Sequence, residues 1–88
     1  MTQRLVDRDR IAGEIRAQAR ARGLGASLCP SEVARALAPS GWRDLMEAVR
    51  GVADDLADQG EITVTQRGKR VRAGTARGPI RLGLRARE

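Results

Sequence analysis

Four basic side chains lie within six residues of each other: Arg67, Lys69, Arg70 and Arg72. Guanidinium and ammonium groups form charge-assisted hydrogen bonds, and the planar fork of arginine suits the oxygens of a phosphate. Phosphate contacts supply much of the affinity of proteins for duplex nucleic acid, so this segment is a candidate phosphate-binding site. A simpler role is also open, because Lys and Arg on an exposed strand discourage edge-to-edge aggregation.

A second set of side chains that could bind nucleic acid lies in segment 41–59. Arg43, Glu47 and Arg50 are spaced to share one face of a helix. Arginine can read guanine and glutamate can accept from cytosine N4, so this face is a candidate for reading bases. The alternative is a solvated ladder of ion pairs, since Arg43–Glu47 and Arg50–Asp54 are i,i+4 pairs that each contribute only a fraction of a kcal/mol.

We expect no enzymatic activity and no metal or cofactor site. The chain has no His and no Tyr, and Cys29 is its single cysteine. Nucleophilic, acid–base and metal chemistry rely mainly on such residues, and the carboxylates here are interleaved with arginines. Cys29 precedes a predicted helix, where it could be a redox-sensing thiol or a packed or capping residue. Gly23 and Gly25 are predicted to end a helix, because neither the strand nor the Lys-Ser/Thr pair of a phosphate loop accompanies them.

Charge is unevenly distributed along the 88 residues, which carry a net charge of +6. Residues 1–37 hold seven basic and four acidic side chains, residues 38–61 hold two and six, and residues 62–88 hold eight and one. A basic excess of this size favours an anionic partner, with nucleic acid as the first candidate. An acidic protein is the alternative, and a second copy could pair its acidic middle with a basic end.

Length and composition predict one globular domain over residues 1–88. Hydrophobic residues make up 41% and charged residues 32% of the chain, as in folded rather than disordered proteins. The charged first ten residues do not resemble a signal peptide, and no apolar run approaches the roughly 20 residues that span a bilayer. We therefore expect a cytoplasmic protein that does not bind membranes, in agreement with a lone cysteine.

Hydrophobic periodicity predicts three helices, over about 8–22, 30–37 and 41–59. Ser40 is the expected N-cap of the third and longest helix, and Gly60 is expected to end it. The apolar stripe of this helix comprises Trp42, Leu45, Met46, Val49, Val52, Ala53 and Leu56. Trp42, the only aromatic residue, is predicted to anchor the core rather than to stack on a base, which argues against single-strand binding.

A basic β-hairpin, or wing, is predicted over about 61–73. Apolar and polar residues alternate in 61–66, and Arg67-Gly68 offers a tight turn. Residues 74–78 are expected to be flexible, and a strand or extended segment is predicted over about 79–85. Residues 26–29 could form a short edge strand. The order of elements predicts an α+β fold: a winged helix-turn-helix with three helices followed by a β-hairpin wing.

The chain also resembles a small, uncharacterised bacterial family of winged helix-turn-helix domains of unknown function. The resemblance covers about residues 11–84 and rests on four segments: CPSEVAR (29–35), WRDLM (42–46), VRGVA (49–53) and GPIRL (78–82). It implies the winged-helix fold. It implies no activity and no functional residues, because the family has none established.

Two functions follow as hypotheses. The first is a regulatory domain that binds double-stranded DNA and contacts its phosphates through the basic wing. Its candidate nucleic-acid-binding residues are Arg67, Lys69, Arg70, Arg72, Arg43 and Arg50. The second is a protein-interaction or structural module, in which the acidic third helix and the basic wing bind a protein partner or a second copy of the chain to form a homodimer.

Overall fold

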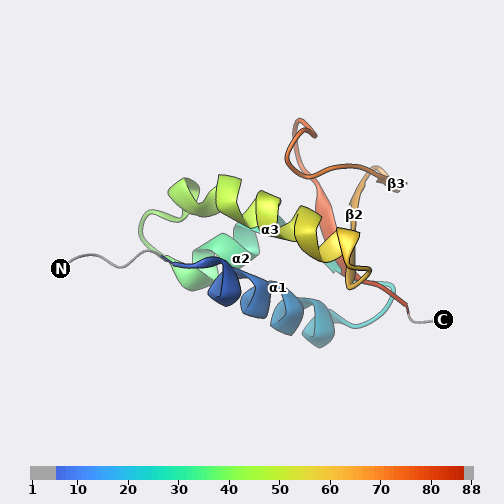
Figure 1. Ribbon diagram of the computed structural model, residues 1–88, viewed down its shortest axis with the longest axis horizontal. Helices are drawn as coiled ribbons and strands as arrows, with labels where there is room; N and C mark the ends of the chain where they lie inside the picture. Colours follow the sequence, from blue (N-terminus) through green and yellow to red (C-terminus); the bar gives the residue numbers. More distant parts are fainter. Residues whose placement is uncertain (1–5, 87–88) are drawn as a thin grey trace.

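The computed structural model describes residues 6–86 and is an α+β structure, in which three helices pack against a small antiparallel sheet (Figure 1). In chain order the elements are α1 (Arg8–Arg22), β1 (Ser27–Leu28), α2 (Pro30–Leu37), the 3-10 helix η1 (Trp42–Leu45), α3 (Met46–Asp58), β2 (Ile62–Gln66), β3 (Lys69–Arg70) and β4 (Arg81–Leu84). None of the helices in this described part is long and apolar enough to cross a membrane.

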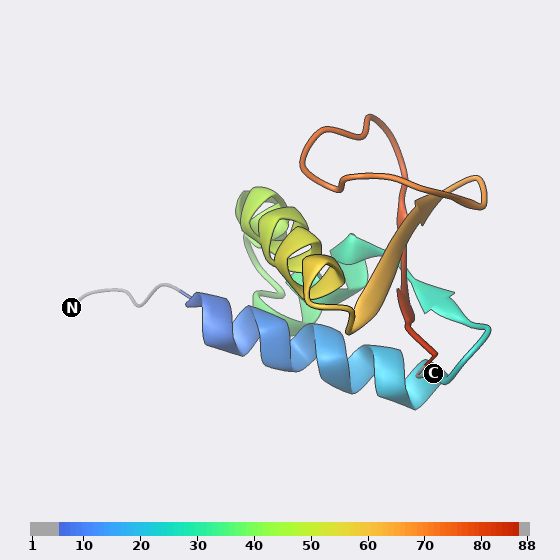
Figure 2. The ribbon, with the colours of Figure 1, turned by 45° about the vertical axis from the view of Figure 1, so that its right-hand side comes forward.

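The sheet has four strands in the order β1-β4-β2-β3, and every neighbouring pair is antiparallel. The last strand in the sequence therefore lies inside the sheet, between the first strand and the hairpin (Figure 2). Leu82 of β4 is paired with Leu28 on one side and with Val64 on the other. The sheet is thus larger than the wing predicted from the sequence, because β1 and β4 extend it.

The core fills the space between the helices and the inner face of the sheet. In α1, Ile11, Ile15 and Ala19 are buried at the spacing of one helical face, and β2 alternates buried Ile62 and Val64 with half-buried threonines. The remaining buried apolar residues are Leu28, Val33, Ala34, Val49, Val52, Ala53, Leu56, Ala73, Ile80 and Leu82. A core built from aliphatic side chains of three helices and three strands holds the elements in place.

The third helix begins differently from the prediction. Instead of one helix capped by Ser40, the chain turns at Gly41, whose φ of 92° is left-handed, and enters η1 before α3. No side-chain cap precedes η1, so the prediction that Ser40 is the N-cap is wrong. A left-handed residue is needed at the turn, and glycine takes that conformation without strain. The predicted apolar stripe is fully buried only from Val49 onward, and Trp42 at its start is half-buried.

Two glutamates join elements that are far apart in the sequence. Glu32, in the first turn of α2, accepts a hydrogen bond from the Cys29 backbone N–H at 2.9 Å and pairs with Arg22 of α1. Glu61, just before β2, accepts from Arg16 of α1 at 2.7 and 3.1 Å. The Cys29 N–H is the main cause that lowers the pKa of Glu32, and the hydrogen bond from Arg16 is the main cause that lowers the pKa of Glu61.

These carboxylates predict an acid-sensitive part of the stability. Because the pKa of each is lower in the folded protein than its ordinary value of 4.5, their contribution is complete above that value and is lost as pH falls through the folded pKa. Chemical denaturation between about pH 6 and about pH 3 should show this loss. The double variant Glu32→Gln/Glu61→Gln should have a flatter profile over this range. A variant profile as steep as that of the wild type would contradict the assignment.

The central position of β4 makes a second prediction. Leu82 is fully buried between two strands, so Leu82→Ala leaves a cavity and should lower the free energy of unfolding by about 2–5 kcal/mol. Leu24→Ala is the matched control, because Leu24 is 64% exposed and its truncation should change stability by no more than about 0.5 kcal/mol. Urea titration of the two variants checks the difference, and similar losses in both would contradict the described core.

Candidate nucleic-acid interface

The wing ends in a two-residue turn formed by Arg67 and Gly68. Their φ angles are 53° and 83°, the left-handed pair that joins two strands with the correct twist. Gln66 and Lys69 pair directly across this turn, and Thr65 pairs with Arg70. Arg67, Lys69 and Arg70 are all exposed at this end of the hairpin. We call these three residues the wing-tip cluster.

The segment that follows β3 is held against α3 by a buried carboxylate. Asp54 is only 7% exposed, and its two oxygens accept from the backbone N–H groups of Ala73 at 2.6 Å and Gly74 at 2.9 Å. A Cβ on Gly74 would lie 3.3 Å from one of these oxygens, so glycine allows the close approach. The predicted pairing of Asp54 with Arg50 on a solvated helix face is therefore wrong.

Arg50 binds the same segment through its carbonyl groups. Its guanidinium donates to the carbonyl oxygens of Ala73 and Ala76, each at 3.0 Å, and of Gly78 at 2.9 Å. These bonds occupy both terminal nitrogens of Arg50. The guanidinium is thus directed to the chain's own backbone, and this geometry does not fit the predicted role of Arg50 in reading bases.

Gln66 of β2 binds the far end of the segment that follows β3, at residues 77–79. Its amide nitrogen donates to the carbonyl oxygens of Arg77 at 2.5 Å and Pro79 at 3.1 Å. Within the segment, the Ala76 N–H donates to the Arg72 carbonyl at 2.9 Å and forms a turn. Residues 74–78 are therefore a hydrogen-bonded arm, unlike the flexible stretch predicted from their glycines.

Arg72, another predicted nucleic-acid-binding residue, is paired within the chain. It donates to Asp58 of α3 at 2.6 Å, and its Nε lies 3.9 Å from the Asp54 carboxylate. The hydrogen bond to Asp58 is the main cause that raises the pKa of Arg72 above its ordinary value. The side chain is exposed, but its charge is largely neutralised by α3, so Arg72 joins the wing to the helix.

The acidic charge of the third helix is mostly used inside the molecule. Asp54 binds backbone, Asp58 binds Arg72, and Asp55 forms an ion pair with Arg8 of α1. Glu61 pairs with Arg16. The separation of acidic and basic segments in the sequence thus corresponds in part to contacts between them, while the exposed Asp44 and Glu47 form no ion pair within residues 6–86.

A second cationic cluster lies where η1 meets α2. The guanidinium carbons of Arg35 and Arg43 lie 4.2 and 4.5 Å from the centre of the Trp42 ring. Trp42 packs against the core and is half-buried, whereas both arginines are exposed. Sequence reasoning identified Arg43 and missed Arg35, because its place over the ring depends on how α2 meets η1 and on no local spacing.

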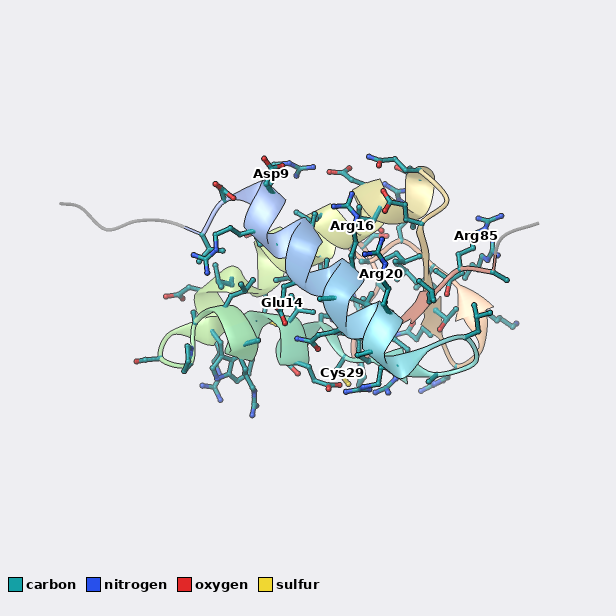
Figure 3. All side chains as sticks on the ribbon, turned by 90° about the horizontal axis from the view of Figure 1, so that it is seen from below. Asp9, Glu14, Arg16, Arg20, Cys29 and Arg85 are labelled. Atoms are coloured by element: carbon teal, nitrogen blue, oxygen red, sulfur yellow. The ribbon has the colours of Figure 1, made fainter. Side chains whose placement is uncertain are left out.

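The opposite end of the molecule carries an open groove of about 940 Å³ beside the C-terminal half of α1. Figure 3 shows Arg16 and Arg20 along this face of α1, with Arg85 beyond them. Cys29 lies at a different edge, where it accepts a hydrogen bond from Arg81 at 2.7 Å while Arg81 also donates to Ser27 Oγ at 2.9 Å. Neither region includes any of the six predicted nucleic-acid-binding residues.

The six predicted residues thus fall into three groups. Arg67, Lys69 and Arg70 come together at the wing tip, and none of them forms an ion pair within residues 6–86. Arg50 and Arg72 are directed to the chain itself. Arg43 lies with Arg35 and Trp42 at the start of the third helix. The candidate interface therefore rests on the wing-tip cluster.

One family model matches the chain, over residues 8–85, which extends from α1 to just beyond β4. Its description is "Protein of unknown function (DUF3253)". This agrees with the resemblance to an uncharacterised domain family. No curated protein matches the chain.

The buried Asp54 carboxylate generates a prediction for the wing. Asp54→Ala leaves the Ala73 and Gly74 N–H groups without their acceptor, so it should lower the free energy of unfolding by about 2–4 kcal/mol. It should also speed amide hydrogen exchange at these two residues. Asp58→Ala removes an exposed ion pair and should cost about 1 kcal/mol or less. If Asp54→Ala were as mild as this control, the carboxylate would not hold the arm.

Proposed function

The chain belongs to the DUF3253 family, and from this premise we propose that it is a winged helix-turn-helix domain that binds double-stranded DNA, mainly through phosphate contacts of its wing tip. The family's function is unknown, so the proposal rests on geometry. The single observation that carries it is the wing-tip cluster: three exposed cations without an ion pair among residues 6–86, at the end of a hairpin fixed to the third helix.

The order of elements supports the winged-helix part of the proposal. Two helices with a short strand between them precede the longest stretch of helix that leads into the hairpin, and β4 returns between β1 and β2. This arrangement brings α3 and the wing to the same side of the molecule, with α1 on the other side (Figure 1). A helix and a wing that share a side can contact neighbouring parts of one duplex.

The anchoring of the wing supports the DNA-binding part. Asp54, Arg50 and Gln66 bind seven backbone groups of residues 73–79 and so hold the base of the wing before any partner arrives. A preformed surface loses less conformational entropy on binding. The uncompensated charges at its tip supply the sequence-independent attraction to phosphates.

The proposal uses the predicted site residues unequally. Arg67, Lys69 and Arg70 are the phosphate contacts, and Arg43 is a further contact near the start of the third helix. Arg50 and Arg72 shape the wing. The role is that of a cytoplasmic binding domain, regulatory rather than catalytic. The protein-interaction hypothesis is the alternative: Asp54 and Asp58 bind within the chain, whereas the exposed Glu47 forms no ion pair among residues 6–86.

Fluorescence anisotropy of a labelled mixed-sequence duplex, titrated with the protein across a range of salt, tests the proposal. Each phosphate contact contributes about −0.9 to the slope of log K against log salt, so a wild-type slope of about −3 or steeper is expected. Arg67→Ala/Lys69→Ala/Arg70→Ala should weaken binding at low salt by at least about a hundredfold and make the slope shallower by about 3.

The control removes the same charge elsewhere. Arg10→Ala/Arg20→Ala/Arg85→Ala lowers the net charge equally and leaves the wing intact, so it should retain most of the affinity. Equal losses in the two triple variants would mean that net charge alone attracts the duplex. If the wild type binds no duplex at low salt, the proposal is overturned, and the protein-interaction hypothesis becomes the leading one.

A further inference from the structure

The Arg35, Trp42 and Arg43 side chains form a compact cationic cluster at the corner between α2 and η1. Both guanidinium carbons lie within 4.5 Å of one ring centre, so they are less than about 9 Å apart. Cation–π attraction offsets part of the repulsion between the two charges. It also fixes both side chains on a ring that is itself packed against the core.

Neither charge is neutralised within the described residues. The ion pairs among residues 6–86 involve Arg8, Arg16, Arg22 and Arg72, and none involves Arg35 or Arg43. Both side chains are exposed. A guanidinium that stacks on a ring through its face keeps the N–H groups of its edge free to donate, and that edge matches the oxygens of a phosphate. The cluster therefore presents two oriented anion donors without an internal acceptor.

We propose that Arg35, Trp42 and Arg43 form a second phosphate-binding site, which takes backbone phosphate of the duplex that the wing tip binds. The proposal rests on the proposed function and deepens it. Two guanidinium groups close together match a ligand with dense, regular negative charge, and duplex DNA carries one charge per about 1.7 Å of its axis. Trp42 positions the arginines, and its face does not receive a base because guanidinium groups already lie over it.

The chain carries a built-in reporter for this site, since Trp42 is its only tryptophan. An anion that engages the guanidinium groups changes their contact with the ring, so Trp42 fluorescence and its single indole N–H resonance should both respond. The first titration uses inorganic tripolyphosphate at low salt, with sodium chloride at the same ionic strength as the reference. We expect a saturable response to tripolyphosphate that chloride does not reproduce.

Variants show where that response arises. Arg35→Gln/Arg43→Gln should weaken tripolyphosphate binding by at least about tenfold, whereas the wing-tip triple variant and Arg20→Gln should keep the saturable response of Trp42. Circular dichroism checks that each variant retains its helices. No saturable response in the wild type, or the same response in Arg35→Gln/Arg43→Gln, overturns the proposal whatever the wing does.

The duplex titration separates this proposal from the proposed function. Arg35→Gln/Arg43→Gln should weaken duplex binding and make the salt slope shallower by about 1–2, while Arg20→Gln leaves both unchanged. If the wing-tip variant loses the duplex but Arg35→Gln/Arg43→Gln binds it with wild-type affinity and slope, the wing-led function stands and the second site falls. If the wild type binds no duplex at low salt, the proposed function fails and the assignment of the cluster to nucleic acid fails with it.

Discussion

The contact between α3 and the backbone of residues 73–79 is the constraint on which the packing of the wing and of β4 depends. Asp54 has only acceptors and takes two N–H groups, and Arg50, one helical turn earlier, has only donors and takes three carbonyl groups. Together the two side chains pair the backbone N–H and C=O groups of this irregular segment, as a neighbouring strand pairs those of a β-strand. The arm can therefore pack on the helix without burying unpaired backbone groups. The chain continues from this segment into Ile80 and β4, where Ile80 and Leu82 are buried in the core.

The same contact changes how the charges should be understood. In the sequence, an acidic helix followed by a basic hairpin suggests two surfaces that each bind a partner of opposite charge. In the folded chain most of these carboxylates bind α1 or the wing, so each pair fastens two elements together. Eleven of the fifteen Lys and Arg side chains of residues 6–86 form no ion pair, and the wing tip and the ring of Trp42 are two places where such cations gather. A net charge of +6 therefore says less about the binding surface than the position of these cations does.

Local patterns predicted the elements well and the contacts between them poorly. Hydrophobic periodicity indicated α1, in which Ile11, Ile15 and Ala19 are buried, and Arg67-Gly68 indicated the hairpin turn, because both depend on neighbours in the sequence. The role of Arg50 could not be predicted in this way. Its partners lie more than twenty residues away, and an arginine beside acidic residues on a helix looks the same whether it faces water or an arm of backbone.

The place of β4 in the sheet bears on how the chain folds. Ser27 and Leu28 find their partners only in Gly83 and Leu82, and β2 needs the same strand on its inner side. Contacts between segments so far apart in the sequence slow folding, since the chain must close a long loop before they form. During synthesis α1, α2 and α3 can leave the ribosome and associate while β1 still lacks a partner. The sheet can close only after residues 81–84 have emerged, because both β1 and β2 pair with β4.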